Sequence, residues 1–435
     1  MRAFLAAAVA LVSSAAFAET LSVEEAVRRA LESSPQVQAA RERKLAADDA
    51  ARSVRGQFGP QLGLSDELQH FSGPFKRSVQ FDSPVPGAPP IQTEFPIRDQ
   101  NTNTFAASAR QPVVGLLRIS QDFVSANEQA EAAQAALEVT ERAMREAMES
   151  AYLRMFEARA ARDVAKSSQV QLAEQLTVAQ ARVEAGALTT ADVLRVQVAK
   201  ANIQQQELQA GVQESDARNA ILTLLGLPVE APIEFSEPVS LEAEAEKPAP
   251  DYQTANDEAQ RLRPDLKQQL HLLDSAQATA RSRLASLLPD IDLTAAYVRV
   301  DGQALAQQDA AYIGVRMSWP IWMWGTQWYA HRAAVHQAES NKWATAEASR
   351  SVQRDVSSRL DLLRSATSAI DVAKTALTSA EEAYRVTSAV VQAGSGTTTD
   401  LLDAQSALTQ AKLNLVRSRY QQALARVQLR RAMGG

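Results

Sequence analysis

The sequence predicts a mainly α-helical chain with a small β part, organised as two tandem repeats. Three observations support this fold class: an internal duplication, two long stretches without proline, and short segments in which apolar and polar residues alternate. A length of 435 residues would by itself suggest two or three globular domains. The duplication indicates instead that one structural unit is used twice.

The composition excludes several classes of protein. The chain is 46% apolar and 22% charged, has no cysteine, and carries 45 basic and 51 acidic residues for a formal charge of −6. These values exclude a disulfide scaffold, a thiolate metal site, a polytopic helical membrane protein and a strongly basic nucleic-acid binder. The sequence contains no HExxH, GxSxG, phosphate-loop or GxGxxG motif. We therefore expect no enzyme, no catalytic residues, no cofactor and no metal.

Residues 1–18 are typical of a secretory signal peptide. They combine Arg2, an apolar stretch over Phe4–Val12, and the small-residue pattern Ala16-Phe17-Ala18 that precedes signal cleavage. After residue 18 the sequence has no run of about 18 consecutive apolar residues, so no segment there could cross a bilayer as a helix. Without cysteine, a bacterial lipid anchor has no attachment point. We expect export to the periplasm, the outer membrane or the medium.

The duplication sets the expected domain boundaries. AGALTTADVL at residues 185–194 aligns without a gap on AGSGTTTDLL at residues 393–402. A second register pairs Pro35 with Pro264, and the first half contains an insertion between residues 64 and 112. We expect a first repeat over residues 19–227 and a second over residues 251–435. Residues 228–250, rich in proline and acidic side chains, would join them as a linker or an equatorial strap.

Each repeat should begin with a helix and end with a helical hairpin. Interior prolines break helices, and none occurs between Pro112 and Pro228 or after Pro320. In each of these windows a glycine followed by threonines and an aspartate predicts a helix end and a new N-cap. The turn residues are Gly186, Thr189, Thr190, Gly394, Gly396 and Thr397. The expected helices are residues 23–57, 121–186 and 192–225, then 254–288, 329–394 and 400–433.

The helices carry stripes suited to lateral packing. Apolar and small residues recur at alternating spacings of three and four over Leu363–Val391 and again over Leu401–Ala432, which is coiled-coil spacing. A second, weaker stripe runs from Leu402 to Val427. A helix with two stripes has a neighbour on each side, as in the wall of a tube. An ordinary antiparallel bundle would give the same heptads.

Four segments read as β-strands. Residues 61–71, 102–113, 291–297 and 311–321 alternate apolar and polar residues, and about 9 to 11 such residues suffice for a transmembrane strand. Four strands leave two open edges, which lipid does not tolerate, so closure would need several copies of the chain. Residues 71–102 contain six prolines and read as an exposed loop. The corresponding connection, residues 300–310, is tighter.

A cluster of tryptophans follows the last strand. Trp319, Trp322, Trp324 and Trp328 lie where an aromatic girdle at the membrane surface would be expected. A buried aromatic cluster of a soluble core is the alternative.

The order of these features resembles the TolC outer-membrane efflux family. The resemblance rests on the opening LSVEEAVRRALESSPQ, on ARVEAGALTTADVL and on VVQAGSGTTTDLLDAQ, and covers nearly all of the chain after residue 18. It implies a homotrimer with a 12-stranded β-barrel in outer-membrane lipid and an α-barrel tunnel in the periplasm. The resemblance further implies that the channel acts with a periplasmic adaptor and an inner-membrane transporter to export small molecules or polypeptides. It implies no nucleic-acid partner.

The resemblance also implies an entrance site. Two aspartates one turn apart after the second hairpin match Asp400 and Asp403, which share a helix face. In a trimer they would form a ring of carboxylates that attracts cations and raises its own proton affinity. The alternative is a capping role at the helix N-terminus, as for Asp192 in the first repeat. The family's latch positions are occupied by Val391 and Gly396, so we expect the closed entrance to depend on packing and on Asp192, a third entrance residue, with other partners.

A second class of function stays open from the sequence. A secreted or periplasmic coiled-coil scaffold or adhesin would share the leader and the heptads but would not need alternating strands that end in tryptophans.

Overall fold

The computed structural model describes residues 19–435, and the expected signal peptide lies outside them. The chain divides into two compact units. The first contains residues up to Glu42, Ala135–Leu266 and Ala348–Gly435, and the second contains Arg43–Gln134 and Lys267–Glu347. None of the helices formed by the described residues has a stretch long and apolar enough to span a bilayer.

The first unit is helical. It contains α1 (Val23–Ser33), α4 (Thr190–Leu224), α5 (Val239–Ala245), α6 (Tyr252–Leu262) and α9 (Thr398–Ala432), together with most of α3 (Gly115–Glu184) and α8 (Thr326–Gln392). Its largest core cluster joins α1, α3, α4, α5 and α9, with Met148, Tyr152 and Ile221 fully buried. The Tyr152 hydroxyl donates to the carbonyls of Leu21 at 2.8 Å and Ser236 at 2.5 Å. Backbone carbonyls thus satisfy the hydroxyl group of this buried tyrosine.

Residues 228–250 are folded. β1 (Glu19–Leu21) pairs in parallel with β5 (Ile233–Phe235), and α5 follows. Leu241 and Ala245 of α5 are buried in the same core cluster as α9. Arg430 of α9 forms ion pairs with Glu244 on α5 and with Glu149 on α3. This segment is therefore a strap packed on the helices.

The two helices expected before the strands are each broken. Instead of one helix over residues 23–57, α1 ends at Ser33 and α2 (Pro35–Gly56) follows. Instead of one over 254–288, α6 ends at Leu262 and α7 (Pro264–Ala285) follows. Ser34 and Arg263 adopt extended backbone, with ψ of 126° and 122°. A residue before proline avoids the α region, while proline is suited to the first position of a new helix.

The expected stripes are buried against neighbouring helices. Leu363, Ile370 and Ala373 of α8 are buried, and so are Leu408 and Leu429 of α9. One cluster packs α8 against α9 and α6, and the second stripe of α9 places Ala423 and Val427 in the cluster with α3. α9 therefore has neighbours on both sides, as the two-stripe pattern predicts.

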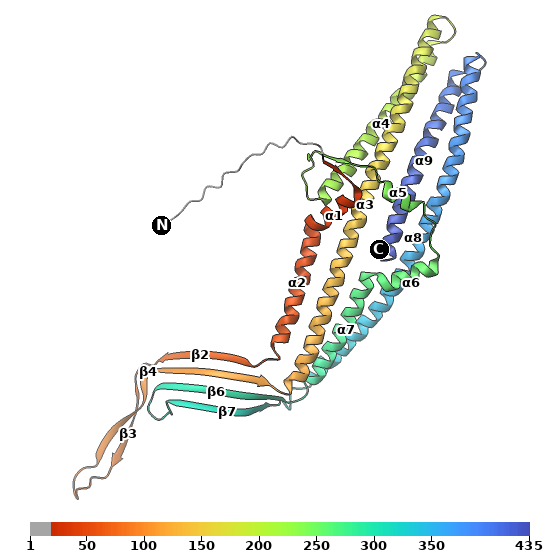
Figure 1. The fold of residues 1–435 in the computed structure, drawn as a ribbon. Helices are drawn as coiled ribbons and strands as arrows, with labels where there is room; N and C mark the ends of the chain where they lie inside the picture. Colours follow the sequence, from red (N-terminus) through yellow and green to blue (C-terminus); the bar gives the residue numbers. More distant parts are fainter. Residues whose placement is uncertain (1–18) are drawn as a thin grey trace, which may run out of the picture. The chain divides into compact units, whose positions relative to one another are not determined.

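The second unit contains an antiparallel sheet ordered β2-β4-β6-β7 (Figure 1). Its strands are β2 (Gln61–His70), β4 (Ile91–Pro112), β6 (Asp290–Gln303) and β7 (Asp309–Ser318). The registers Leu64↔Ala107, Ala107↔Tyr297 and Ala295↔Ile313 place the apolar residues of all four strands on one face. The helices of this unit are α2, α7 and the adjoining parts of α3 and α8.

The expected loop over residues 71–102 is largely a β-hairpin, which corrects that prediction. β3 (Phe75–Phe81) pairs with the first residues of β4, a strand that begins at Ile91 and not near residue 102. Four of the prolines lie between the two strands. Pro96 lies within β4 beside the register shift at Phe75/Lys76, a position that tolerates a residue without an N–H donor.

Candidate functional site

The candidate site is the pair of turns that join α3 to α4 and α8 to α9. Gly186 and Gly394 have φ of 75° and 80°, the left-handed backbone that glycine adopts without strain at a helix end. Thr190 and Thr398 are the first residues of α4 and α9. The turn residues expected from the sequence all lie within these two connections or at their helical boundaries.

Each turn ends in the same capping arrangement. The Thr397 backbone N and Oγ1 donate to Asp400 Oδ2 at 3.1 and 2.6 Å, and Asp400 N donates to Thr397 Oγ1 at 3.1 Å. In the first repeat, Thr189 N and Oγ1 donate to Asp192 Oδ2 at 3.1 and 2.7 Å. This is the capping box, with aspartate in the place usually taken by glutamate.

The capping threonines set the acidity of both aspartates. Hydrogen bonds from the Thr397 side chain and backbone lower the pKa of Asp400, because they stabilise its charged form. The hydrogen bonds from Thr189, with a smaller contribution from Arg195, lower the pKa of Asp192. Within one chain, both carboxylates are therefore held in the charged state.

Asp403 has a different environment. It lies one helical turn after Asp400 on α9 and is exposed. The described residues provide no hydrogen bond or ion pair to its carboxylate. Unlike Asp400, Asp403 has no capping role. Stabilisation of the helix therefore explains an aspartate at position 400 but not at position 403.

The two turns are linked to each other. Arg195 of α4 lies 3.4 Å from Asp192 Oδ1, and its Nη1 donates to Thr399 Oγ1 at 3.2 Å in the second turn. Arg182 of α3 donates to the Val391 carbonyl of α8 at 3.3 Å. Gln175 of α3 donates to the Tyr384 hydroxyl at 3.1 Å. The sequence analysis did not identify these three contacts, because they pair residues of different repeats.

Buried polar pairs continue the link between the repeats away from the turns. Ser168 of α3 and Thr409 of α9 are buried, with their hydroxyl oxygens 3.0 Å apart. Gln405 donates to Gln171 Oε1 at 2.8 Å. A cavity of about 350 Å³ lies beside these pairs, lined by α3, α4, α8 and α9. In the sequence, these buried pairs are visible only as Gln, Ser and Thr residues at positions that interrupt the apolar stripes.

Val391 and Gly396 pack against each other. Val391 is buried, and a Cβ added to Gly396 would lie 2.8 Å from Val391 Cγ2 and 3.2 Å from Val390 Cγ1. The positions at which the family's latch side chains are expected therefore form a compact apolar contact within the second turn.

The tryptophans follow the sheet and are exposed. Trp319, Trp322 and Trp324 lie between β7 and α8, and Trp328 is in the first turn of α8. Trp322 and Trp324 form an edge-to-face contact with ring centroids 5.6 Å apart, and Trp319 Nε1 donates to the Leu287 carbonyl at 3.3 Å. Within the single chain, these four tryptophans therefore do not form a buried cluster.

Within residues 19–435, no group of three or more histidine, aspartate or glutamate side chains is arranged to hold a metal ion. The chemistry that the site offers is electrostatic: the exposed carboxylates of Asp400 and Asp403 after the second turn, and the carboxylate of Asp192, whose side chain is 16% exposed, after the first.

Comparison with known proteins identifies the family. The model of the outer membrane efflux protein family matches residues 26–227 and 255–435. A curated relative, the alkaline protease secretion protein AprF of Pseudomonas aeruginosa, is 25% identical over 275 residues, which are 62% of this chain and 56% of the relative. The chain thus spans about half the length of this relative.

Solved structures agree at the level of the fold. The outer membrane protein VceC of Vibrio cholerae has a TM-score of 0.77 and 17% identity, with 95% of this chain and 96% of VceC covered. A membrane protein from Pseudomonas aeruginosa has a TM-score of 0.79 and 18% identity, with 96% and 91% covered. The family match extends over both repeats and both turns. The chain therefore belongs to the outer membrane efflux protein family and is a protein of the outer membrane.

Proposed function

We propose that three copies of this chain form one channel, the exit duct of a tripartite efflux or type I secretion system. The observation that carries this proposal is the apolar face of the sheet. Leu62, Ile313 and Val315 are 80%, 80% and 72% exposed, and their strands are paired so that the apolar residues align across all four. A water-exposed face of this kind suits lipid and not solvent.

The open edges of the sheet support closure by several copies. β2 and β7 end the order β2-β4-β6-β7, so each has one edge without a partner strand among the described residues. Unpaired backbone groups are not tolerated in the hydrocarbon core. Three sheets of four strands, joined β2 to β7 of the next copy, give the 12-stranded barrel that the family resemblance implies.

An exposed stripe on α4 supports the same assembly. Leu194, Val198, Leu208 and Val212 are each more than half exposed, and they fall at heptad spacing on one side of the helix. The other side of α4 buries Val196, Ile203 and Ala210 within the chain. We assign the exposed stripe to a neighbouring copy, which would close the helices into an α-barrel tunnel.

The paired turns would form the periplasmic entrance. In the trimer, Asp400 and Asp403 would contribute six carboxylates around one axis, with Asp192 beside them. The entrance assignment depends mainly on Asp403, because Asp400 and Asp192 also have a capping role at their helices. We propose that the closed entrance depends on the Val391–Gly396 packing and on the contacts of Arg182 and Arg195. Trp319, Trp322, Trp324 and Trp328 would form the girdle at one membrane surface.

The proposal assigns no catalysis to the chain, in keeping with a family of channels. Energy would come from an inner-membrane transporter joined through a periplasmic adaptor. The cargo is a small molecule or a polypeptide, and a relative named for alkaline protease secretion favours testing polypeptides first. We further propose repeat boundaries at 19–227 and 251–435, with the strap at 228–250.

Cell fractionation with gel analysis tests the proposal. We expect an outer-membrane protein that migrates as a trimer without heating and as a monomer after boiling, and that conducts ions in planar bilayers. A soluble periplasmic monomer would instead support a scaffold without a pore.

A further inference from the structure

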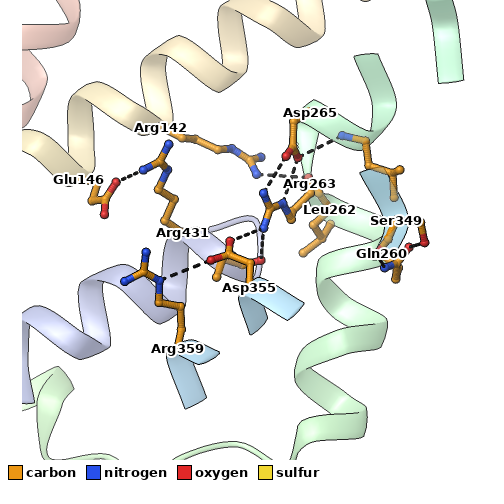
Figure 2. A network of polar contacts seen from close by, with 12 residues as sticks. Arg142, Glu146, Gln260, Leu262, Arg263, Asp265, Ser349, Asp355, Arg359 and Arg431 are labelled. Atoms are coloured by element: carbon orange, nitrogen blue, oxygen red, sulfur yellow. Dashed lines mark hydrogen bonds and ion pairs between the residues drawn. The ribbon is translucent and has the colours of Figure 1, made fainter. Parts of the chain in front are cut away.

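The break between α6 and α7 lies at the centre of an ionic cluster (Figure 2). Arg263, the residue at the break, donates through Nη2 to Asp265 Oδ2 at 2.7 Å and through Nη1 to Asp355 Oδ2 on α8 at 2.7 Å. Its Nη1 also donates to the Ala432 carbonyl at the end of α9, at 3.3 Å. One guanidinium thus connects the break to two further helices.

The side chain of Arg263 is only 17% exposed. Burial disfavours its charged form, but hydrogen bonds to Asp265 and Asp355 outweigh this effect and raise the pKa of Arg263. The cluster is therefore charged and paired. Removing Arg263 would leave Asp265 without its ion-pair partner and Asp355 with Arg359 alone.

α3 and α9 complete the enclosure. Arg142 of α3 donates to the Leu262 carbonyl at 3.2 Å and to the Gly434 carbonyl. Arg431 of α9 pairs with Glu146 of α3, and Arg359 of α8 lies 3.4 Å from Asp355 and donates to Gln428 at 2.8 Å. Figure 2 shows Arg263 between Asp265 and Asp355, Arg359 directed at Asp355, Arg142 reaching to Leu262, and Arg431 directed at Glu146.

Gly434 lies directly against the break. Its φ is +88°, and an added Cβ would lie 2.9 Å from both the Arg263 backbone N and the Leu262 carbonyl carbon. Such an approach to backbone cannot be relieved by moving a flexible side chain. Gly434, which follows the C-cap residue Met433 of α9, is therefore required to be glycine by both conformation and space.

The matching break in the first repeat lacks this enclosure. Ser34 takes the place of Arg263, since Pro35 aligns with Pro264. The polar contact of this break to the end of α4 is one hydrogen bond, from Ser33 Oγ to the Leu225 carbonyl at 3.0 Å, and the remaining packing is apolar, through Ala30, Val37 and Leu225 of the largest core cluster. Gly226, the counterpart of Gly434, has φ of +70° and no atom within 4 Å of its added Cβ. The two breaks have the same backbone and different surroundings.

We propose that Arg263 is a positioning residue whose ion pairs lock the base of the α8–α9 hairpin, whereas the base of the α3–α4 hairpin is held by apolar packing and one hydrogen bond from Ser33. α9 carries Asp400 at its other end, about 50 Å away at the helical rise. A tilt of about 5° at the base would displace that end by about 4 Å. Arg263 thus sets the position of the entrance carboxylates without contacting them. The link to an entrance rests on the proposed function.

Hydrogen–deuterium exchange of the purified, full-length protein tests the lock. Arg263→Ala should speed exchange of the amides of residues 258–266 by about ten-fold, given the usual worth of a charge-assisted hydrogen bond. It should also speed exchange in residues 396–404. Ser33→Ala, the matched control, should leave residues 258–266 and 396–404 unchanged.

Two further variants cover the case in which Arg263→Ala fails to fold. Arg263→Lys keeps the charge but not the fork that joins Asp265 to Asp355, so partial loosening is expected. Asp355→Asn should loosen residues 258–266 in the same way. Unchanged exchange of residues 258–266 in folded Arg263→Ala and Asp355→Asn variants would overturn the lock. Faster exchange confined to residues 258–266 would overturn the positioning role.

Bilayer conductance gives the second readout. Arg263→Ala should raise the resting conductance by roughly two-fold, because an entrance about 4 Å wider passes more ions, and Ser33→Ala should not. Unchanged conductance in a folded Arg263→Ala channel would overturn the proposal. A wild type that does not conduct at all would refute the proposed channel function, while the exchange comparison would still decide whether Arg263 locks the break.

Discussion

Thr397 and Asp400 hold each other by reciprocal hydrogen bonds: Thr397 Oγ1 donates to Asp400 Oδ2 at 2.6 Å, and Asp400 N donates to Thr397 Oγ1 at 3.1 Å. Thr189 and Asp192 make the first of these contacts in the other repeat, at 2.7 Å. Asp400 therefore has a structural role that Asp403 does not share. The two residues can be separated by experiment, although the resemblance assigns them to one ring.

Substitutions at the two aspartates should have different effects. Asp400→Ala should lower thermal stability of the second hairpin, since Thr397 loses its partner in the capping box. Asp400→Asn, which keeps an acceptor but loses the charge, should lower it less, and Asp403→Ala should not lower it. All three should weaken cation selectivity and multivalent-cation block in planar bilayers, because each removes three charges from the trimer. If Asp403→Ala left both selectivity and block at wild-type values, the entrance assignment would be withdrawn and capping would remain as the role of Asp400.

The block by multivalent cations should depend on pH through Thr397. Hydrogen bonds from Thr397 lower the pKa of Asp400 from its ordinary value of 3.8, so the carboxylate stays charged. Its contribution to stability and to block is lost only as the pH falls through that lowered pKa. Thr397→Val should move the midpoint of block to higher pH. It should also cost about 1 kcal/mol as a lost cap. Thr189→Val is the control and should leave the midpoint of the Asp400 ring unchanged.

The contact between Val391 and Gly396 gives a steric prediction. Gly396→Ala should strain the second turn and raise resting conductance, because the new Cβ would lie 2.8 Å from Val391 Cγ2. Val391→Ala combined with Gly396→Ala should restore the wild-type value, since it removes the atom that is hit. Gly394→Ala, where space is free but φ is +80°, should cost about 1 kcal/mol without rescue by Val391→Ala. Identical behaviour of the single and double variants would exclude the packing explanation.

The faces of the sheet should respond differently to charge. Ile313→Arg places a cation on the apolar face and should cost about 2 to 4 kcal/mol of membrane stability. Tyr312→Arg, on the opposite face of the same strand, should be tolerated. Urea unfolding of the channel in outer-membrane preparations measures both. Equal cost at the two positions would contradict the assignment of the apolar face to lipid.

Patterns that depend on a single chain segment could be predicted from the sequence. The heptads of α8 and α9, the turns at Gly186 and Gly394, and the alternation of β2 and β7 are local and were predicted close to their observed bounds. The breaks at Pro35 and Pro264 are local as well. The residue before a proline avoids the α conformation, so the continuous helices expected over residues 23–57 and 254–288 are wrong at these positions.

Other features could not be read from one segment. The pairing of β3 with the extended β4 joins residues on either side of a proline-rich turn, and composition gave only a loop. The parallel pair β1–β5 joins residues more than two hundred positions apart. The link of Arg195 to Thr399 and the enclosure of Arg263 arise only when the repeats pack. Such contacts leave no periodic trace in the sequence.

Joining of one copy's β2 to the next copy's β7 is tested most directly by crosslinking. The chain has no cysteine, so a variant with Ser65→Cys on β2 and Gly314→Cys on β7 can be treated with a bismaleimide in intact outer membranes. We predict boiled gels with bands for one, two and three linked chains and none larger. A protein linked only within single chains, or into an open series of larger products, would contradict a closed ring of three.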